Sequence, residues 1–224
     1  MEPLSTYTGE LTRALNGMPQ TEGYPTEYYR VVSESIIKAV GDSLQEVDSN
    51  QVSSLIDLLI ECKKSERKIL IVGAGRSGLT GRAFAMRLMH LSFGVHVIGE
   101  TITPAVEKND VLLAISGSGE TTLVLAAAKI AKNMGAKTVA VTSHPKSPLG
   151  QIADRIVIIP GRTKVAEKKD YFQRQILGVH EPLAPLGTLF ELASAVFLDS
   201  LIVELMRRLN LSEDAMKKRH ATIE

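Results

Sequence analysis

The chain has 224 residues, of which 44% are hydrophobic, and this is enough to bury one sizeable core. Lysine and arginine total 26 against 25 acidic residues, so no bulk charge is present to hold nucleic acid or an anionic membrane. An anionic ligand must therefore be held by local geometry. The single cysteine, Cys62, excludes an intrachain disulfide and any multi-cysteine metal site, and it favours a reducing, cytoplasmic location.

The sequence shows no pattern typical of a signal peptide or of a membrane span. The N-terminus lacks a basic stretch followed by an apolar one. The longest apolar stretch, residues 189–206, contains Glu191, Asp199 and Glu204. We therefore expect a protein that is neither secreted nor membrane-spanning.

Residues 1–27 carry Gly, Pro, Thr and Tyr without a clear period, which predicts an N-terminal extension to which we assign no role. Residues 28–224 predict a single domain that begins with two helices. Apolar residues recur there at helical spacing from about residue 27 to 44 and from about 51 to 63.

Five short apolar runs follow these helices, separated by polar or glycine-rich segments. Their near-continuous Val, Ile and Leu content is typical of strands buried on both faces of a sheet. Helical patterns lie between most of them, clearest at 79–91 and 121–134, and this alternation implies parallel pairing with right-handed crossovers. The predicted fold class is α/β, a doubly wound five-stranded parallel sheet flanked by helices. The predicted strands are Ile69–Val72, Val95–Ile98, Val111–Ile115, Thr138–Thr142 and Ile156–Ile159.

The C-terminal part of the chain predicts a loop and two helices. Residues 160–185 carry five basic residues without a strong period and predict a mobile basic loop. A long helix is expected from about residue 188 to 209, and a short one after Ser212, whose hydroxyl suits an N-cap. Asn210 separates the two helices.

The first candidate ligand site is the glycine-rich run Gly73–Gly78, which follows the first predicted strand and opens a helix. Its glycines let the backbone approach an anion, and the helix N-terminus supplies free N–H groups. The run also matches G-x-G-x-x-G, and Glu100 follows where a ribose-binding acid stands in dinucleotide sites. From this loop alone, a dinucleotide site and a plain strand–helix turn both stay open.

The second candidate site is the run Ser116–Thr122, which follows the third predicted strand and opens another helix. Its hydroxyl groups, with the backbone N–H groups freed by its two glycines, form a neutral oxyanion cradle. It is not a P-loop, which requires G-x-x-x-x-G-K-[ST]. A serine-capped helix start is the plain structural alternative. Two such loops together fit one small phosphorylated ligand at the C-terminal edge of the sheet.

The second loop and the strand before it resemble the phosphate-binding signature of SIS (sugar isomerase) domains. The segments Gly99–Ala105, Pro185–Glu191 and Arg219–Glu224 narrow the resemblance to the 6-phospho-3-hexuloisomerases, over roughly residues 30–224. By this resemblance, four hydroxyl side chains contact the phosphate: Ser77, Ser116, Ser118 and Thr121. The other candidate ligand-binding residues are Gly75, Arg76 and Gly117 in the two loops and Thr142 at the end of the fourth strand.

The resemblance also implies an activity. The family interconverts hex-3-ulose 6-phosphate and fructose 6-phosphate through a cis-enediol, in the ribulose monophosphate pathway of formaldehyde metabolism, without a metal or an organic cofactor. It further implies a homotetramer with active sites near subunit interfaces. The apolar helix at 189–209 supports an oligomer, because it is more hydrophobic than one buried face requires.

Glu191 is the candidate catalytic base. The reaction needs a carboxylate that carries a proton between neighbouring carbons, and the resemblance gives this role to Glu191 in the first turn of the long helix. The spacing Thr188-x-x-Glu191 is also that of a capping box, in which Glu191 bonds back to the N-cap amide. Spacing alone favours the cap, and the resemblance favours catalysis.

His220 is the second catalytic candidate. In the related isomerases a histidine near the C-terminus, or one from another subunit, reaches the active site, and an imidazole acts as acid or base near neutral pH. A solvated tail histidine is the alternative. His144 and His180 are held in reserve, and His90 and His96 are expected to be structural.

Three other functions stay open. A sugar-phosphate-sensing SIS module attached to a DNA-binding domain is disfavoured, because residues 1–66 carry 11 acidic against 5 basic residues, a net charge of −6. An NAD-dependent reductase rests on the first loop alone and leaves the second loop and Glu191 without a role. The third alternative is another SIS isomerase, acting on arabinose 5-phosphate or a phosphoheptose. It stays open because the shape of the pocket decides which phosphosugar fits.

Overall fold

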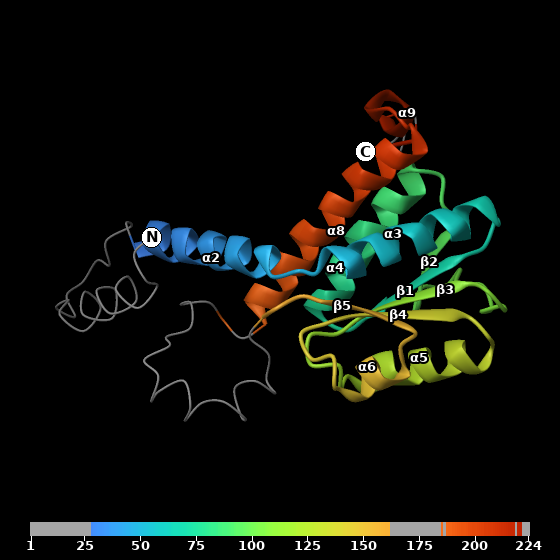
Figure 1. Cartoon of the computed structure of the whole chain (residues 1–224), viewed down its shortest axis with the longest axis horizontal. Helices are drawn as coiled ribbons and strands as arrows, with labels where there is room; N and C mark the ends of the chain where they lie inside the picture. The colour runs from blue at the N-terminus through green and yellow to red at the C-terminus, as the bar shows by residue number, and fades with distance from the viewer. Residues whose placement is uncertain (1–27, 162–184, 186, 218, 221–224) are drawn as a thin grey trace.

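The fold is that of a computed structural model, which describes residues 28–161, 185, 187–217 and 219–220 (Figure 1). The expected extension at 1–27, most of the basic loop with His180, and the last four residues of the tail lie outside the described residues. The elements in chain order are α2 (Tyr28–Gln45), α3 (Ser49–Lys64), β1 (Ile69–Gly73), α4 (Arg76–His90), β2 (Val95–Val97), β3 (Val111–Ile115), α5 (Thr122–Asn133), β4 (Lys137–Thr142), α6 (Pro148–Ile152), β5 (Arg155–Ile158), α8 (Thr188–Leu209) and α9 (Glu213–Lys217).

Five strands form one sheet in the order β2-β1-β3-β4-β5. Every neighbouring pair is parallel, and the last residues of the adjacent inner strands β1 and β3, Gly73 and Ile115, lie in register. All five residues of β3 are buried, as a near-continuous apolar run predicts for a central strand. The predicted five-stranded parallel sheet is confirmed, and each strand agrees with its predicted range to within one residue at either end.

Helices cover both faces of the sheet (Figure 1). Side chains alternate between the faces along each strand, so Ile69 and Ile71 of β1 join one core while Leu70 and Val72 join the other. The first core is closed by α3, α4 and α8, and the second, smaller core by α5 and α6. The sheet is therefore doubly wound, as the alternation of strand and helix patterns predicts.

The strand order puts a switch point between β1 and β3. The chain leaves β1 through α4 on one face of the sheet and leaves β3 through α5 on the other face (Figure 1). Because the two connections diverge, a crevice opens at the carboxyl ends of these neighbouring strands, which is where ligands bind in open α/β sheets. Both candidate loops begin at these two strand ends.

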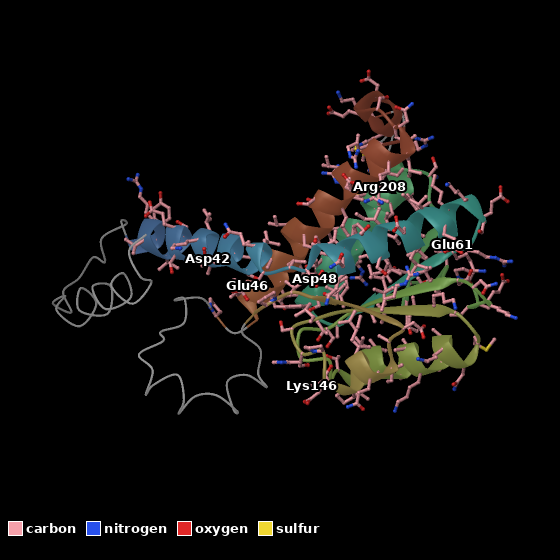
Figure 2. The ribbon with its side chains drawn as sticks, viewed as in Figure 1. Asp42, Glu46, Asp48, Glu61, Lys146 and Arg208 are labelled. Atoms are coloured by element: carbon pink, nitrogen blue, oxygen red, sulfur yellow. The ribbon has the colours of Figure 1, made fainter. Side chains whose placement is uncertain are left out.

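The helix α8 is tied to the layer formed by α2 and α3. Asp48, between α2 and α3, caps α3 by accepting hydrogen bonds from the amides of Asn50 at 2.6 Å and Gln51 at 3.4 Å (Figure 2). Arg208 near the end of α8 pairs with Asp57 of α3 at 2.8 Å. The ion pair with Asp57 thus joins α3 to the end of α8 that lies farthest from the candidate base.

The helices differ from the prediction in two places. α4 begins at Arg76, earlier than the expected residue 79, so the first loop passes directly into the helix. The five-residue α6 is too short to show a helical period in the sequence. α8 has the expected bounds and ends at Asn210, whose φ of 52° is left-handed. Among the described helices, none is both long and apolar enough to cross a membrane.

Candidate active site

The loop Gly73–Gly78 carries the chain from β1 straight into α4. A Cβ added at Gly73 would lie 2.8 Å from the backbone carbonyl group of Ser77, so this turn accepts no larger residue. Gly75 is the N-cap of α4 and has a φ of 57°. The amides of Arg76 and Ser77 start the helix, where N–H groups have no intrahelical acceptor and the helix dipole adds positive charge. The loop thus has the backbone features of an anion-binding turn.

The second loop is held together by its own hydroxyl groups. Ser116 Oγ lies 2.9 Å from Thr121 Oγ1 and accepts a hydrogen bond from the Gly119 amide at 3.2 Å. Ser118 Oγ accepts one from the Glu120 amide at 3.2 Å. Ser116 is buried, whereas Ser118 and Thr121 are half-buried. Ser116 therefore shapes the loop, and the other two hydroxyls keep surface for a ligand.

The second loop also rests on α6, a contact that the sequence analysis missed. Gly119 has a φ of 63°, and a Cβ added there would lie 1.9 Å from Ser147 Oγ. The amide of Leu149 in α6 donates to the Gly119 carbonyl at 3.0 Å. In the sequence, Ser147 followed by Pro148 indicates the start of α6, because serine favours the N-cap and proline the first position of a helix.

Thr142 supports the second loop from β4. It is fully buried, and its Oγ1 donates to the Gly117 carbonyl at 3.2 Å and accepts from the His144 amide at 3.2 Å. The Ser143 amide donates to the same Gly117 carbonyl at 3.1 Å. Thr142 thus braces the second loop, and its contact with a ligand stays a prediction.

Glu191 meets the first loop directly. It lies in the first turn of α8, and its Oε2 forms an ion pair with Nε of Arg76, the first residue of α4. The Glu191 side chain is 15% exposed and the Arg76 side chain 57%. A largely buried carboxylate therefore lies beside a loop whose backbone donors suit a phosphate.

The capping box at the start of α8 is not formed. The N-cap is Gly187, at a φ of 89°, so Thr188 is already the first helical residue and the N-cap residue has no side chain to cap the helix. The Thr188 amide is occupied by the Pro185 carbonyl at 3.1 Å. Because the N-cap lies one residue earlier than the capping box requires, Glu191 falls one residue too late to close it. Its carboxylate instead reaches Arg76.

His220 lies at the opposite end of α4 from the loop. Its ring stacks on that of His90, with centroids 4.1 Å apart and an angle of 22° between the planes. Since Arg76 begins α4 and His90 ends it, the 15 residues of the helix separate the two ends by about 22 Å. The structure therefore does not bring His220 and Glu191 of one chain together.

Three further residues considered in the sequence lie within or just after strands β2 and β4. His144 follows β4 at the same sheet edge as the loops and is half-buried, as is His96 within β2. Glu100, the candidate ribose-binding acid, is exposed and pairs with Arg82 of α4 at 2.8 Å. In the part of the chain that the structure describes, no group of three or more His, Cys, Asp or Glu residues is placed to hold a metal ion.

Comparisons with known proteins identify the family. Residues 63–172 match the model of the SIS domain. A 3-hexulose-6-phosphate isomerase of Methanocaldococcus jannaschii is 43% identical over 78% of this chain and 84% of its own length. A 3-hexulose-6-phosphate isomerase of Bacillus subtilis is 35% identical over 89% of this chain and 98% of its own length. A crystal structure of a Methanococcus jannaschii protein, from which a function as 3-hexulose-6-phosphate isomerase was inferred, has a TM-score of 0.67 and 38% identity, over 88% of this chain and 99% of that one. The chain therefore belongs to the SIS-domain family, among the relatives that carry the name 3-hexulose-6-phosphate isomerase.

Proposed function

We propose that the chain is a phosphosugar isomerase that interconverts hex-3-ulose 6-phosphate and fructose 6-phosphate. The observation that carries this proposal is the ion pair between Glu191 and Arg76, since it puts a largely buried carboxylate against a loop suited to a phosphate. The name that relatives at 43% and 35% identity carry supports the same substrate. The proposed pathway is the ribulose monophosphate pathway of formaldehyde metabolism, and the proposed location is the cytoplasm, in keeping with the free thiol of Cys62.

In this mechanism the two loops hold the phosphate and Glu191 moves one proton between C3 and C2. Starting from fructose 6-phosphate, Glu191 takes the C3 proton, the electron pair of that bond forms the C2=C3 double bond, and the oxygen at C2 gains a proton. The cis-enediol then loses the proton of its C3 hydroxyl as the C3 carbonyl forms, and Glu191 returns its proton to C2. The oxygen protons are assigned to His220 of a neighbouring subunit.

The proposed ligand contacts follow from exposure. Ser118 and Thr121 are half-buried hydroxyls of the second loop, and they suit the phosphate oxygens. Ser116 and Thr142 are buried and hold the loop in shape. The remaining proposed phosphate contacts are the exposed Gly75 and Arg76, together with Ser77 and Gly117. Ser77 and Gly117 are buried, so they are proposed from their place in the two loops and not from exposure.

We further propose a homotetramer with active sites near the subunit interfaces. Large apolar side chains remain exposed on the packed helices α4 and α8, and this surface begins next to the site, since Leu192 directly follows Glu191. Exposed apolar surface of this kind marks protein interfaces. Its members are Leu79, Met86 and Met89 of α4 and Leu192, Val196 and Val203 of α8. Light scattering over a range of protein concentrations tests the state, and a monomer with full turnover would contradict it.

The function is tested by a turnover assay with three sugar phosphates. We expect conversion of hex-3-ulose 6-phosphate to fructose 6-phosphate, followed by NMR, with arabinose 5-phosphate and sedoheptulose 7-phosphate turned over far more slowly. Preference for either of the latter would overturn the substrate and leave the isomerase class intact. In parallel thermal-shift scans, fructose 6-phosphate should raise the melting temperature and NAD should not. The reverse result would favour the reductase.

A further inference from the structure

Arg76 takes part in two features of the site at once. Its backbone begins α4 within the loop Gly73–Gly78, so it lies where the phosphate is expected. Its side chain is paired with Glu191, the proposed base, which is carried by a different helix. A single residue thus links the phosphate loop to the carboxylate.

The two side chains of this ion pair differ in exposure to solvent. Arg76 is 57% exposed and Glu191 is 15% exposed, so the cation lies on the open side and the carboxylate on the inner side. Glu191 Oε2 is buried and accepts no well-directed hydrogen bond from any described residue. Attraction between the charges therefore holds the pair, and within the described ranges Arg76 pairs with no second acid.

A phosphate group is a stronger partner for Arg76 than this carboxylate. It carries up to two negative charges, and it accepts two parallel hydrogen bonds from the fork of a guanidinium group. Because Arg76 begins in the loop and has a long side chain on the open side, the guanidinium reaches a phosphate at this loop without movement of the backbone.

We propose that the phosphate of the substrate and Glu191 compete for Arg76, so that phosphate binding draws Arg76 away and frees Glu191 to act as the base. The inference rests on the proposed function, because it needs Glu191 as the base and a phosphate at the loop Gly73–Gly78. While the pair is formed, the Arg76 guanidinium lies against Oε2 of Glu191, so this oxygen is covered from the substrate. Binding energy at the phosphate is then used to raise turnover rather than affinity alone.

The test supplies the sugar and the phosphate group as two separate molecules, D-fructose and phosphite. D-fructose, which lacks the phosphate, is incubated with the full-length protein in D₂O, and exchange of its C3 proton is followed by NMR with and without phosphite. In the parent protein, phosphite should accelerate exchange by about threefold to fivefold, because it draws Arg76 from Glu191. Arg76→Ala should exchange fructose at least about threefold faster than the parent without phosphite and should lose the acceleration by phosphite.

Lys132→Ala is the matched control. Like Arg76, Lys132 pairs with an acid from another part of the chain, Asp154 at 3.2 Å, but it lies in the last turn of α5, away from both loops and from the helices of the proposed interface. This variant should behave as the parent in both conditions. If Arg76→Ala lowers exchange equally with and without phosphite, Arg76 merely positions Glu191 and the competition is refuted. Acceleration that persists in Arg76→Ala would refute it as well.

Failure of the proposed function looks different. If the parent does not exchange the C3 proton of fructose 6-phosphate itself, the proposed isomerase function fails, and the inference fails with it. Normal exchange of fructose 6-phosphate together with no effect of phosphite on fructose overturns the inference alone.

A second measurement needs no turnover. If Glu191 and phosphate compete for Arg76, removing the charge of Glu191 strengthens phosphate binding, since Arg76 is then available. Calorimetric titration with inorganic phosphate should show about threefold to tenfold tighter binding by Glu191→Gln than by the parent. In an Arg76→Ala background the same change should give no gain. An equal gain in both backgrounds would mean general charge repulsion and would overturn the competition.

Discussion

The rings of His90 and His220 stack 4.1 Å apart at the end of α4 that lies farthest from Arg76. Within one chain His220 is therefore held away from the carboxylate of Glu191. A catalytic role for His220 requires that this end of α4 in one subunit lie against the loop end of another. The two possible roles of His220, stacking in its own chain and catalysis in a neighbour, predict different outcomes.

Mixing two inactive variants tests the catalytic role of His220. If a neighbouring subunit supplies it, Glu191→Gln and His220→Ala should each be inactive alone. Mixed protomers that exchange freely should recover about a quarter of the parent turnover, because hybrid sites contain both native groups. If His220 only stacks on His90, His220→Ala keeps its turnover and its unfolding free energy falls by about 0.5–1.5 kcal/mol. That result would remove His220 from the mechanism.

Most of the fold could be predicted from the sequence because it depends on local patterns. Buried strands such as Val111–Ile115 are apolar along their whole length, and the helix at 188–209 has a clear stop at Asn210. The position of the N-cap of that helix could not be predicted. It depends on the left-handed backbone at Gly187, whereas the sequence offers Thr188 as an equally good cap.

The sequence predicts the two loops and the carboxylate of the candidate site, but not the contacts between them. Glycine and hydroxyl residues after two strands indicate a phosphate site, and both loops do lie at adjacent strand ends. That Thr142 is buried beneath Gly117, or that Arg76 reaches Glu191, depends on contacts between residues far apart in the chain. No spacing rule encodes such contacts, because they are set by the packing of whole elements.

The two serines of the second loop should respond differently to substitution. Ser118→Ala should weaken phosphosugar binding by about 1.5–3 kcal/mol, the value of a hydrogen bond to a charged group, and leave stability unchanged. Ser116→Ala should also lower the free energy of unfolding by about 1–3 kcal/mol, because its buried hydroxyl bonds Thr121 and the Gly119 amide. Calorimetry and urea unfolding measure the two effects. Ser33→Ala, on the exposed side of α2, is the control. Equal stability of the two loop variants would contradict the distinction.

Gly119→Ala should disrupt the second loop. The left-handed φ of 63° and the close approach of Ser147 Oγ both oppose a Cβ, so the free energy of unfolding should fall by at least about 1–2 kcal/mol and phosphosugar binding should be lost. Gly41→Ala is the control, because a Cβ there in α2 meets nothing within 4 Å and should stabilise the helix by up to about 1 kcal/mol. Urea unfolding decides the matter, and parent-like stability of Gly119→Ala would show that the loop shifts freely.

Cys62 should be unreactive in the folded protein. Burial, together with the negative charges of Asp110 and Glu61, raises the pKa of its thiol to about 11, from a usual value of 9.0. Alkylation at pH 8 should therefore be about 100-fold slower than in urea, because the thiolate is the reactive form. Above pH 9 the unfolded chain loses this proton while the folded chain keeps it, so stability should fall as the pH rises toward 11. Cys62→Ala should lack that part of the slope, and an equal slope in both proteins would refute the assignment.

Glu191→Gln should remove the proton transfer and leave the fold intact. The amide keeps the shape of the side chain but has no basic oxygen, so turnover should fall by at least about 10², the lower value for a positioned general base. Because Glu191 does not cap α8, and because its ion pair with the exposed Arg76 is worth at most about 1 kcal/mol, the melting temperature should stay nearly the same. Glu204→Gln, also on α8 but paired with Arg207 and Arg208, should keep the parent turnover. Exchange of the C3 proton of fructose 6-phosphate with D₂O isolates the chemical step. A Glu191→Gln protein that exchanges this proton at the parent rate would end the assignment of Glu191 as the base, whatever its melting temperature.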